Sequence, residues 1–257
     1  MNFVKHFYKL INYKNSLILL SILYTIGICI KYLNGQFSPD SWTYYELSKN
    51  IFEDFYKINT YRQFQLNTSY GISFPPFHPF IIACINYIYD IGIYAGYFFN
   101  HLILILTLII FSKISKKLFG YEVIGILIFL ILILNIHYIN EVVGARTIPL
   151  AILLFFTMFY FSLEKSFFYK FKYNFLLGIL SGIMVLNRFD ALLPTMMMGI
   201  LIFVNKSNSK VIKNLLVYYI TFFMCISPYI IYSMIHFNSF YISDNSRTAF
   251  LAFNNFV

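Results

Sequence analysis

The sequence of 257 residues is poor in charge, since only 11% of its residues are Asp, Glu, Lys or Arg, whereas soluble domains carry about 25%. A chain with so few charges lacks the polar surface that a soluble globule needs, which excludes a soluble enzyme and a disordered tail. Apolar residues take the place of charge, with 60% hydrophobic residues and a mean hydropathy of +0.70. This composition indicates a protein that crosses a membrane several times.

Cysteines and recognisable ligand motifs are also scarce. Cys29, Cys84 and Cys225 each stand alone in an apolar stretch, which excludes a disulfide scaffold and favours buried small side chains. The sequence contains no histidine and carboxylate spacing typical of metal sites, no glycine-rich phosphate loop and no Gly-x-Ser-x-Gly motif. The sequence therefore requires no cofactor, and it leaves dependence on a divalent metal open.

Long apolar runs define the expected fold. A helix needs about 20 mostly apolar residues to span a bilayer, and the sequence predicts an all-α, polytopic transmembrane bundle of about seven spans. A further stretch, residues 79–90, is too short to span and is predicted to be an interfacial helix. The two shortest spans are expected to form a tight pair that meets at residues 187–190. The predicted spans are Ser16–Leu33, Ile91–Ser112, Tyr121–Ile139, Thr147–Leu163, Tyr173–Leu186, Ala191–Val204 and Leu215–Phe237.

The lysines indicate the topology. Lysine and arginine are enriched in cytoplasmic segments, and a cytoplasmic N-terminus places twelve of the fifteen lysines on the cytoplasmic side. The net charge of +9 then reflects topology, and no nucleic-acid partner is expected. Residues 34–78 become a long first extracytoplasmic loop. The cytoplasmic lysines are Lys5, Lys9, Lys14, Lys113, Lys116, Lys117, Lys165, Lys170, Lys172, Lys206, Lys210 and Lys213.

The outer side receives all four arginines and eight of the ten carboxylates. Arginine is suited to bidentate contacts with phosphate, and carboxylates are common general bases. Chemistry is therefore expected on the outer face. The alternative is that long outer loops simply hold more polar residues.

Asp40 is the candidate base. Ser41 can cap a helix that begins at Trp42, which leaves Asp40 just before this helix and close to the end of the first apolar run. A carboxylate placed there can reach a reacting group held at the membrane boundary. The alternative is that Asp40 only caps the helix.

Several short motifs together resemble a known family. Asp40 is followed by Tyr44 and Tyr45, a Pro-Pro-x-x-Pro stretch at residues 75–79 opens the next apolar helix, and a Gly-x-x-x-Gly motif at residues 178–182 leads to Asn-Arg-Phe-Asp at residues 187–190. This arrangement resembles the GT-C superfamily of polytopic glycosyltransferases, which includes protein O-mannosyltransferases and aminoarabinose transferases. The resemblance extends over nearly the whole chain.

The resemblance implies an inverting transfer of a sugar from a polyprenyl-phosphate donor to a glycan, lipid or protein acceptor on the extracytoplasmic side. In this family an acidic residue early in the first outer loop activates the acceptor, and Asp40 matches it. Outer basic residues hold the lipid phosphate, and Arg188 matches best by position. Members run well beyond 257 residues, so residues 1–257 are expected to be one transmembrane module without the C-terminal part. Further substrate-binding candidates are Arg62, Arg146, Arg247, Tyr44, Tyr45, His78 and Glu141.

Two other functions compete with this interpretation: a lipid-carrier flippase, polymerase or transporter, and a non-catalytic membrane scaffold. A transporter should carry polar residues at mid-membrane along a path, and internal repeats, which are common in transporters, are not visible. The predicted spans contain few polar side chains and no charged one among the most interior, which are His101, Thr107, Thr157, Ser181 and Thr221. The expected partners are membrane lipids, the polyprenyl-phosphate sugar and its acceptor.

Overall fold

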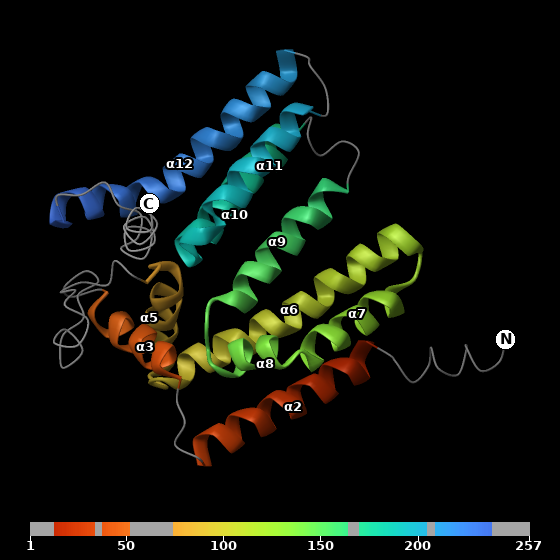
Figure 1. The fold of residues 1–257 in the computed structure, drawn as a ribbon, viewed down its shortest axis with the longest axis vertical. Helices are drawn as coiled ribbons and strands as arrows, with labels where there is room; N and C mark the ends of the chain where they lie inside the picture. The colour runs from red at the N-terminus through yellow and green to blue at the C-terminus, as the bar shows by residue number, and fades with distance from the viewer. Residues whose placement is uncertain (1–12, 34–37, 52–73, 164–169, 205–208, 238–257) are drawn as a thin grey trace, which may run out of the picture. The chain divides into compact units, whose positions relative to one another are not determined.

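The computed structural model describes residues 13–33, 38–51, 74–163, 170–204 and 209–237, and every regular element in these residues is a helix (Figure 1). The predicted all-α class is therefore confirmed for this part of the chain. The elements are α2 (Tyr13–Leu33), α3 (Pro39–Asn50), α5 (Phe77–Tyr89), α6 (Tyr94–Phe119), α7 (Glu122–Leu134), α8 (Ile136–Val143), α9 (Ile148–Ser162), α10 (Phe171–Asn187), the 3₁₀ turn η3 (Phe189–Ala191), α11 (Leu192–Val204) and α12 (Ser209–Phe237).

Two of these helices are long and apolar enough to cross a membrane, over Tyr94–Phe119 and Ile212–Ile235, and a third span results if the bent pair α7 and α8 is counted as one. The chain is thus an integral membrane protein. Helices lie at all seven predicted spans and at the predicted interfacial segment. The number of seven crossings stays a prediction, because among the described residues the combined length and hydropathy of a span is found only in these helices.

The chain divides into two compact units, and the first consists of Met1–Thr43 and Tyr89–Leu163. Its central helix is α6, which packs against α7 and α9 (Figure 1). The approach of α6 and α7 is close at Gly125, where a Cβ atom would overlap the carbonyl of Phe111 and lie 2.8 Å from the amide nitrogen of Ser112. Leu108 and Phe129 are fully buried in the core between these helices.

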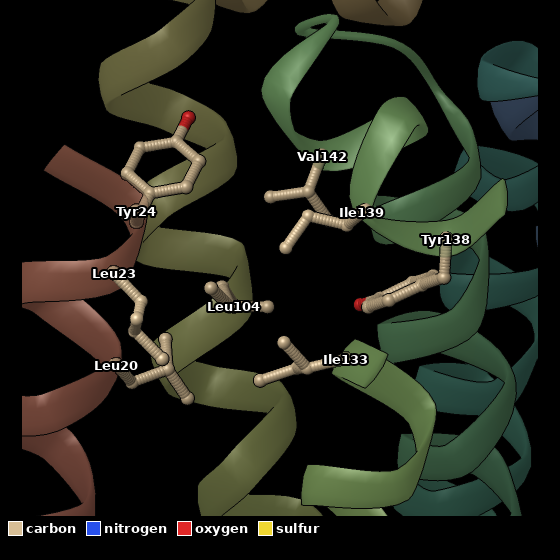
Figure 2. A pocket seen from close by; sticks show the side chains of 8 residues that line it. All are labelled: Leu20, Leu23, Tyr24, Leu104, Ile133, Tyr138, Ile139 and Val142. Carbon is tan, nitrogen blue, oxygen red and sulfur yellow. The ribbon is translucent and has the colours of Figure 1, made fainter. Parts of the chain in front are cut away.

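A small apolar cavity lies beside this core, where α2, α6 and α7 meet α8 (Figure 2). Leu20, Leu104, Ile133 and Val142 contribute to its wall. Its volume of about 20 Å³ has room for roughly one water molecule. The cavity is therefore a packing void, too small for a sugar or a lipid segment.

The second unit consists of Tyr44–Ile88 and Glu164–Val257. Its main contact is between α10 and α12 (Figure 1). Gly178 and Gly182 of α10 face α12 so closely that a Cβ atom at Gly178 would lie 2.6 Å from the carbonyl oxygen of Tyr218. The Tyr218 hydroxyl contacts Ser181 Oγ at 2.9 Å and donates to the carbonyl oxygen of Thr195 at 2.5 Å. Small residues and hydrogen bonds thus join the helices, as is common in membranes.

The polar side chains that the sequence placed deepest in the spans contact their own helix or a neighbouring one. The hydroxyl groups of Thr107, Thr157 and Thr221 each donate to the carbonyl four residues earlier in their own helix. The ring of His101 stacks on Tyr24 with its centroid 4.8 Å away, and its Nε2 lies 3.4 Å from the hydroxyl of Ser21. These contacts are typical of packing residues and give no support to a polar path.

Candidate functional site at the broken helix

The third predicted span is broken into two helices. The sequence predicted one span over Tyr121–Ile139, but α7 ends at Leu134 and α8 leaves at an angle of 81°. Asn135 stands at the break and its Oδ1 accepts the backbone N–H groups of His137 at 2.9 Å and Tyr138 at 3.3 Å. These bonds satisfy the amides at the start of α8. The break directs α8 to the site described below.

The end of α8 forms a Schellman turn. The N–H of Arg146 donates to the carbonyl of Glu141 at 3.1 Å, and the N–H of Ala145 donates to the carbonyl of Val142 at 3.2 Å. These two hydrogen bonds are the pair that defines this motif. Ala145 adopts a left-handed φ of 50°, at a position that glycine usually occupies. The turn brings Arg146 back beside Glu141.

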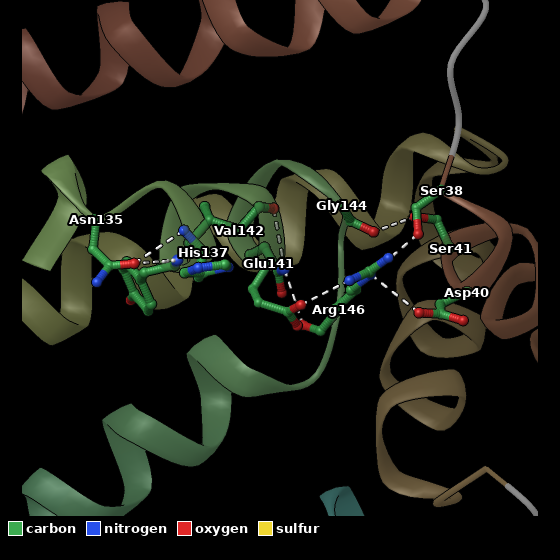
Figure 3. A network of polar contacts seen from close by, with 11 residues as sticks. Ser38, Asp40, Ser41, Asn135, His137, Glu141, Val142, Gly144 and Arg146 are labelled. Carbon is green, nitrogen blue, oxygen red and sulfur yellow. Dashed lines mark hydrogen bonds and ion pairs between the residues drawn. The ribbon is translucent and has the colours of Figure 1, made fainter.

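Arg146 is the centre of the polar cluster (Figure 3). Its Nη1 donates to Glu141 Oε1 at 2.7 Å. Its Nε lies 3.1 Å from Asp40 Oδ2 and donates to Ser38 Oγ at 3.2 Å. One guanidinium thus contacts two carboxylates, and its planar array of donors suits such a contact.

The helix that bears Asp40 begins earlier than predicted. The sequence placed Ser41 as the cap before Trp42, but α3 starts at Pro39 and the N–H of Trp42 donates to the carbonyl of Ser38 at 3.2 Å. Proline favours the first position of a helix because its fixed φ suits it. Asp40 therefore lies in the first turn, where the helix dipole stabilises a negative charge. The Ser41 hydroxyl donates instead to the carbonyl of Gly144.

The two carboxylates of the cluster differ in exposure. The side chain of Glu141 is 17% exposed, whereas that of Asp40 is 43% exposed and that of Arg146 is 34% exposed. Asp40 is thus the carboxylate that a substrate can reach more easily, while Glu141 is held inside.

Arg188 lies in the second unit, at the junction between α10 and η3. Its Nε lies 3.0 Å from Asp190 Oδ1 and its Nη2 lies 2.6 Å from Asp190 Oδ2. The hydrogen bond from Arg188 is the main reason that the pKa of Asp190 is lowered from its ordinary value. The predicted meeting of the two short helices at residues 187–190 is confirmed, but they are not a tight pair, since α10 packs mainly on α12. A shared site of Arg188 and Asp40 stays a prediction.

The remaining predicted site residues lie elsewhere. Tyr44 is buried and meets the fully buried ring of His78 edge-on, with centroids 4.9 Å apart. The Lys49 ammonium nitrogen lies over the ring of Tyr45, 4.3 Å from the ring centroid. Arg62 and Arg247 lie outside the described residues. Substrate contacts of these side chains stay predictions. Within the described ranges, no group of three or more His, Cys, Asp or Glu residues could hold a metal ion.

Sequence reasoning missed the residues that hold the cluster together. No motif pointed to Ser38, or to Asn100, whose amide donates to the carbonyl of Arg146 at 3.1 Å. The bond of Ser41 to the backbone depends on a carbonyl 103 residues away. Asn135 did carry a signal, because an asparagine in the middle of an apolar run is a preferred helix-cap residue. It could have predicted the break.

The fold and the site define an integral membrane protein with a cluster of acidic and basic side chains where α8 ends and α3 begins. The chain belongs to the dolichyl-phosphate-mannose-protein mannosyltransferase family, whose sequence pattern matches residues 73–232. The predicted GT-C membership is thereby confirmed, and family membership makes the chain a membrane glycosyltransferase. The matched range includes Glu141, Arg146 and Arg188 but not Asp40. No curated protein and no solved structure matches the chain.

Proposed function

We propose that the protein transfers a sugar from a polyprenyl-phosphate donor to an acceptor on the extracytoplasmic side of the membrane. The observation that carries this proposal is the cluster of Asp40, Arg146 and Glu141 in a chain of this family. Asp40 accepts the proton of the acceptor nucleophile as it attacks the anomeric carbon. The bond from this carbon to the phosphate oxygen breaks, and polyprenyl phosphate leaves. A single base suffices because inversion is one displacement.

The arrangement of the first unit supports the proposed sidedness. The cluster lies next to the N-terminal part of α6, since Asn100 donates to the carbonyl of Arg146. Lys116 and Lys117 lie in the last turn of the same helix. Asn100 and Lys116 are separated by about 24 Å along the helix at ~1.5 Å per residue. If the lysine end faces the cytoplasm, the cluster faces the opposite side.

The basic residues take two roles in the proposal. Arg146 orients the Asp40 carboxylate and is itself fixed by Glu141, because its guanidinium contacts both carboxylates. Arg188 binds the phosphate of the lipid donor, where a cation stabilises the negative charge of the leaving group. The departing phosphate would then compete with Asp190 for the same guanidinium.

The Asp40→Asn variant tests the base. We expect sugar transfer to fall by about 10²–10⁴-fold, because the amide cannot accept the proton, while membrane abundance stays unchanged. The measurement is transfer of labelled mannose from polyprenyl-phosphate mannose to membrane lipid and protein fractions, with the full chain in liposomes.

Glu46→Gln is the matched control, since Glu46 is another carboxylate of α3 and pairs with Lys49 of the same helix at 3.0 Å. We expect this variant to transfer sugar as the unaltered protein does. Normal transfer by Asp40→Asn would remove Asp40 as the base, and absence of transfer by the unaltered protein from every polyprenyl-phosphate sugar tried would overturn the function.

A further inference from the structure

The turn that carries Arg146 is held by a buried amide of a neighbouring helix. Asn100 of α6 is fully buried. Its Nδ2 donates to the carbonyl of Val142 at 3.3 Å and to the carbonyl of Arg146 at 3.1 Å. These two carbonyls stand on either side of the Schellman turn. One side chain therefore fixes both ends of the segment that aims the Arg146 guanidinium.

The orientation of this amide has one chemical explanation. Only the NH₂ group can satisfy two carbonyl oxygens, since the reverse orientation would place oxygen against oxygen. Oδ1 of Asn100 is buried and has no hydrogen-bond partner among the described residues. A leucine has the same branched shape and would avoid this unsatisfied acceptor. Asn100 is thus best explained by its two donors.

Ser41 supplies a second attachment, from the helix that bears Asp40. Its hydroxyl donates to the carbonyl of Gly144, in the middle of the same turn (Figure 3). The base helix α3 is therefore joined to the turn through the backbone as well as through the ion pair of Asp40 with Arg146. A shift of the turn would shift both partners.

The turn is also conformationally strained. Ala145 has a φ of 50°, a left-handed conformation that is unfavourable for residues with a Cβ atom. Such a conformation persists only where the surroundings impose it, and it clusters at functional sites. Asn100 and Ser41 are the side chains that bond to the carbonyls next to this residue.

We propose that Asn100 is a positioning residue, which fixes the turn at residues 144–146 and through Arg146 sets the orientation of Asp40. This inference rests on the proposed function of Asp40. Asn100 itself touches neither substrate nor reacting atoms. Its effect belongs to the catalytic step, because a misdirected Arg146 would misplace the base while leaving the rest of the substrate site intact.

The test is Asn100→Leu, which keeps the shape and removes both donors. We expect kcat to fall about 10–100-fold, as misplaced catalytic groups commonly do. We expect the KM for polyprenyl-phosphate mannose to change by less than about threefold, since binding of the donor is unaltered. Asn174→Leu is the matched control, because Asn174 is also fully buried and its amide donates to the Lys170 carbonyl of its own helix at 3.1 Å. It should leave kcat per folded protein unchanged.

A double-mutant cycle shows whether Asn100 acts through Arg146. In the Arg146→Met background, we expect Asn100→Leu to lower kcat by less than about twofold, because residues that act as one unit are not additive. Effects that multiply in the double variant, or an unchanged kcat in Asn100→Leu, would overturn the proposal.

Hydrogen exchange separates this inference from the proposed function. We expect the amides of residues 144–146 to exchange faster in Asn100→Leu than in the unaltered protein or in Asn174→Leu. If exchange is faster in Asn100→Leu but the unaltered protein transfers no sugar, Asn100 fixes the turn and the proposed function is wrong. Unchanged exchange would defeat the inference even where transfer is normal.

Discussion

Arg188 and Asp190 form the most regular ion pair of the described residues, with two parallel contacts of 3.0 and 2.6 Å between one guanidinium and one carboxylate. Such forked contacts combine charge with fixed geometry. The pair lies where α10 ends and η3 begins, so it also fastens the connection between two short helices.

This pair predicts a pH dependence of stability. The pKa of Asp190 is lowered in the folded protein, mainly by the hydrogen bond from Arg188. The stabilisation is thus complete above the ordinary aspartate pKa of about 3.9 and is lost as the pH falls through the lower folded-state value. Because the Asp190 side chain is 65% exposed, we expect a contribution of less than about 1 kcal/mol.

Thermal unfolding of the unaltered protein and of Asp190→Asn in detergent, between pH 3 and 7, measures this effect. We expect a constant difference in Tm at neutral pH that shrinks below about pH 4. A difference that stays the same at pH 3 would contradict the assignment. Arg188→Gln should show the same loss, since it removes the other partner.

At the scale of single residues, the sequence identified Asp40, Arg146 and Glu141 but not their contact. Ser38 and Arg146 are 108 residues apart, and no local pattern reports such a distance. Glu141 and Arg146 are five residues apart, which does not place them on one helix face. Their pairing depends on the left-handed Ala145, and an alanine gives no sequence signal for a conformation that glycine usually adopts.

At the scale of elements, helix positions could be predicted well because long apolar runs determine them. The break between α7 and α8 could not be predicted from hydropathy, since the residues on both sides of Asn135 are apolar. The start of α3 differs from the prediction because Pro39 is the first helical residue, whereas the prediction took Ser41 as the cap. The break after α7 and the earlier start of α3 both arise from local hydrogen bonding, which the spacing of apolar residues does not indicate.

The packing of α10 on α12 gives a prediction for the Gly178-x-x-x-Gly182 motif. In Gly178→Ala, the new Cβ atom would overlap the Thr221 hydroxyl and lie 2.6 Å from the carbonyl oxygen of Tyr218. A backbone carbonyl cannot rotate away, so the helices must separate. We expect the free energy of unfolding to fall by about 1–3 kcal/mol, measured by thermal or denaturant unfolding in detergent.

Gly27→Ala is the control for this prediction. Its Cβ would lie 3.4 Å from Val143 Cγ2, which is an ordinary contact, and alanine is the better helix former by about 1 kcal/mol. We expect no loss of stability there. If Gly178→Ala and Gly27→Ala have the same free energy of unfolding, Gly178 is not required for the close approach of α10 and α12.

At the scale of the whole molecule, the family match and the apolar helices agree on a membrane glycosyltransferase, whereas the side of the membrane on which each helix end lies comes only from the lysines. Composition predicted the class because charge is scarce along the entire chain. It could not select the sugar or the acceptor, since these depend on a few side chains and leave no trace in composition.

Labelling of single cysteines tests the topology. In a background with Cys29, Cys84 and Cys225 replaced by serine, Lys49→Cys places a thiol on α3, and Lys117→Cys places one in the last turn of α6. Both lysines are exposed. We expect a membrane-impermeant maleimide to label Lys49→Cys in intact cells and Lys117→Cys only after permeabilisation, because lysine-rich ends stay in the cytoplasm.

The opposite labelling pattern would place Asp40 and Arg146 in the cytoplasm, where the proposed transfer does not take place, so this experiment tests the site as well as the topology. Labelling of both variants in intact cells would show that α6 does not cross the membrane. That outcome would contradict the span assigned to its 26 residues. The expected pattern would leave the Asp40 carboxylate and the Arg146 guanidinium on the extracytoplasmic side, where the proposed transfer takes place.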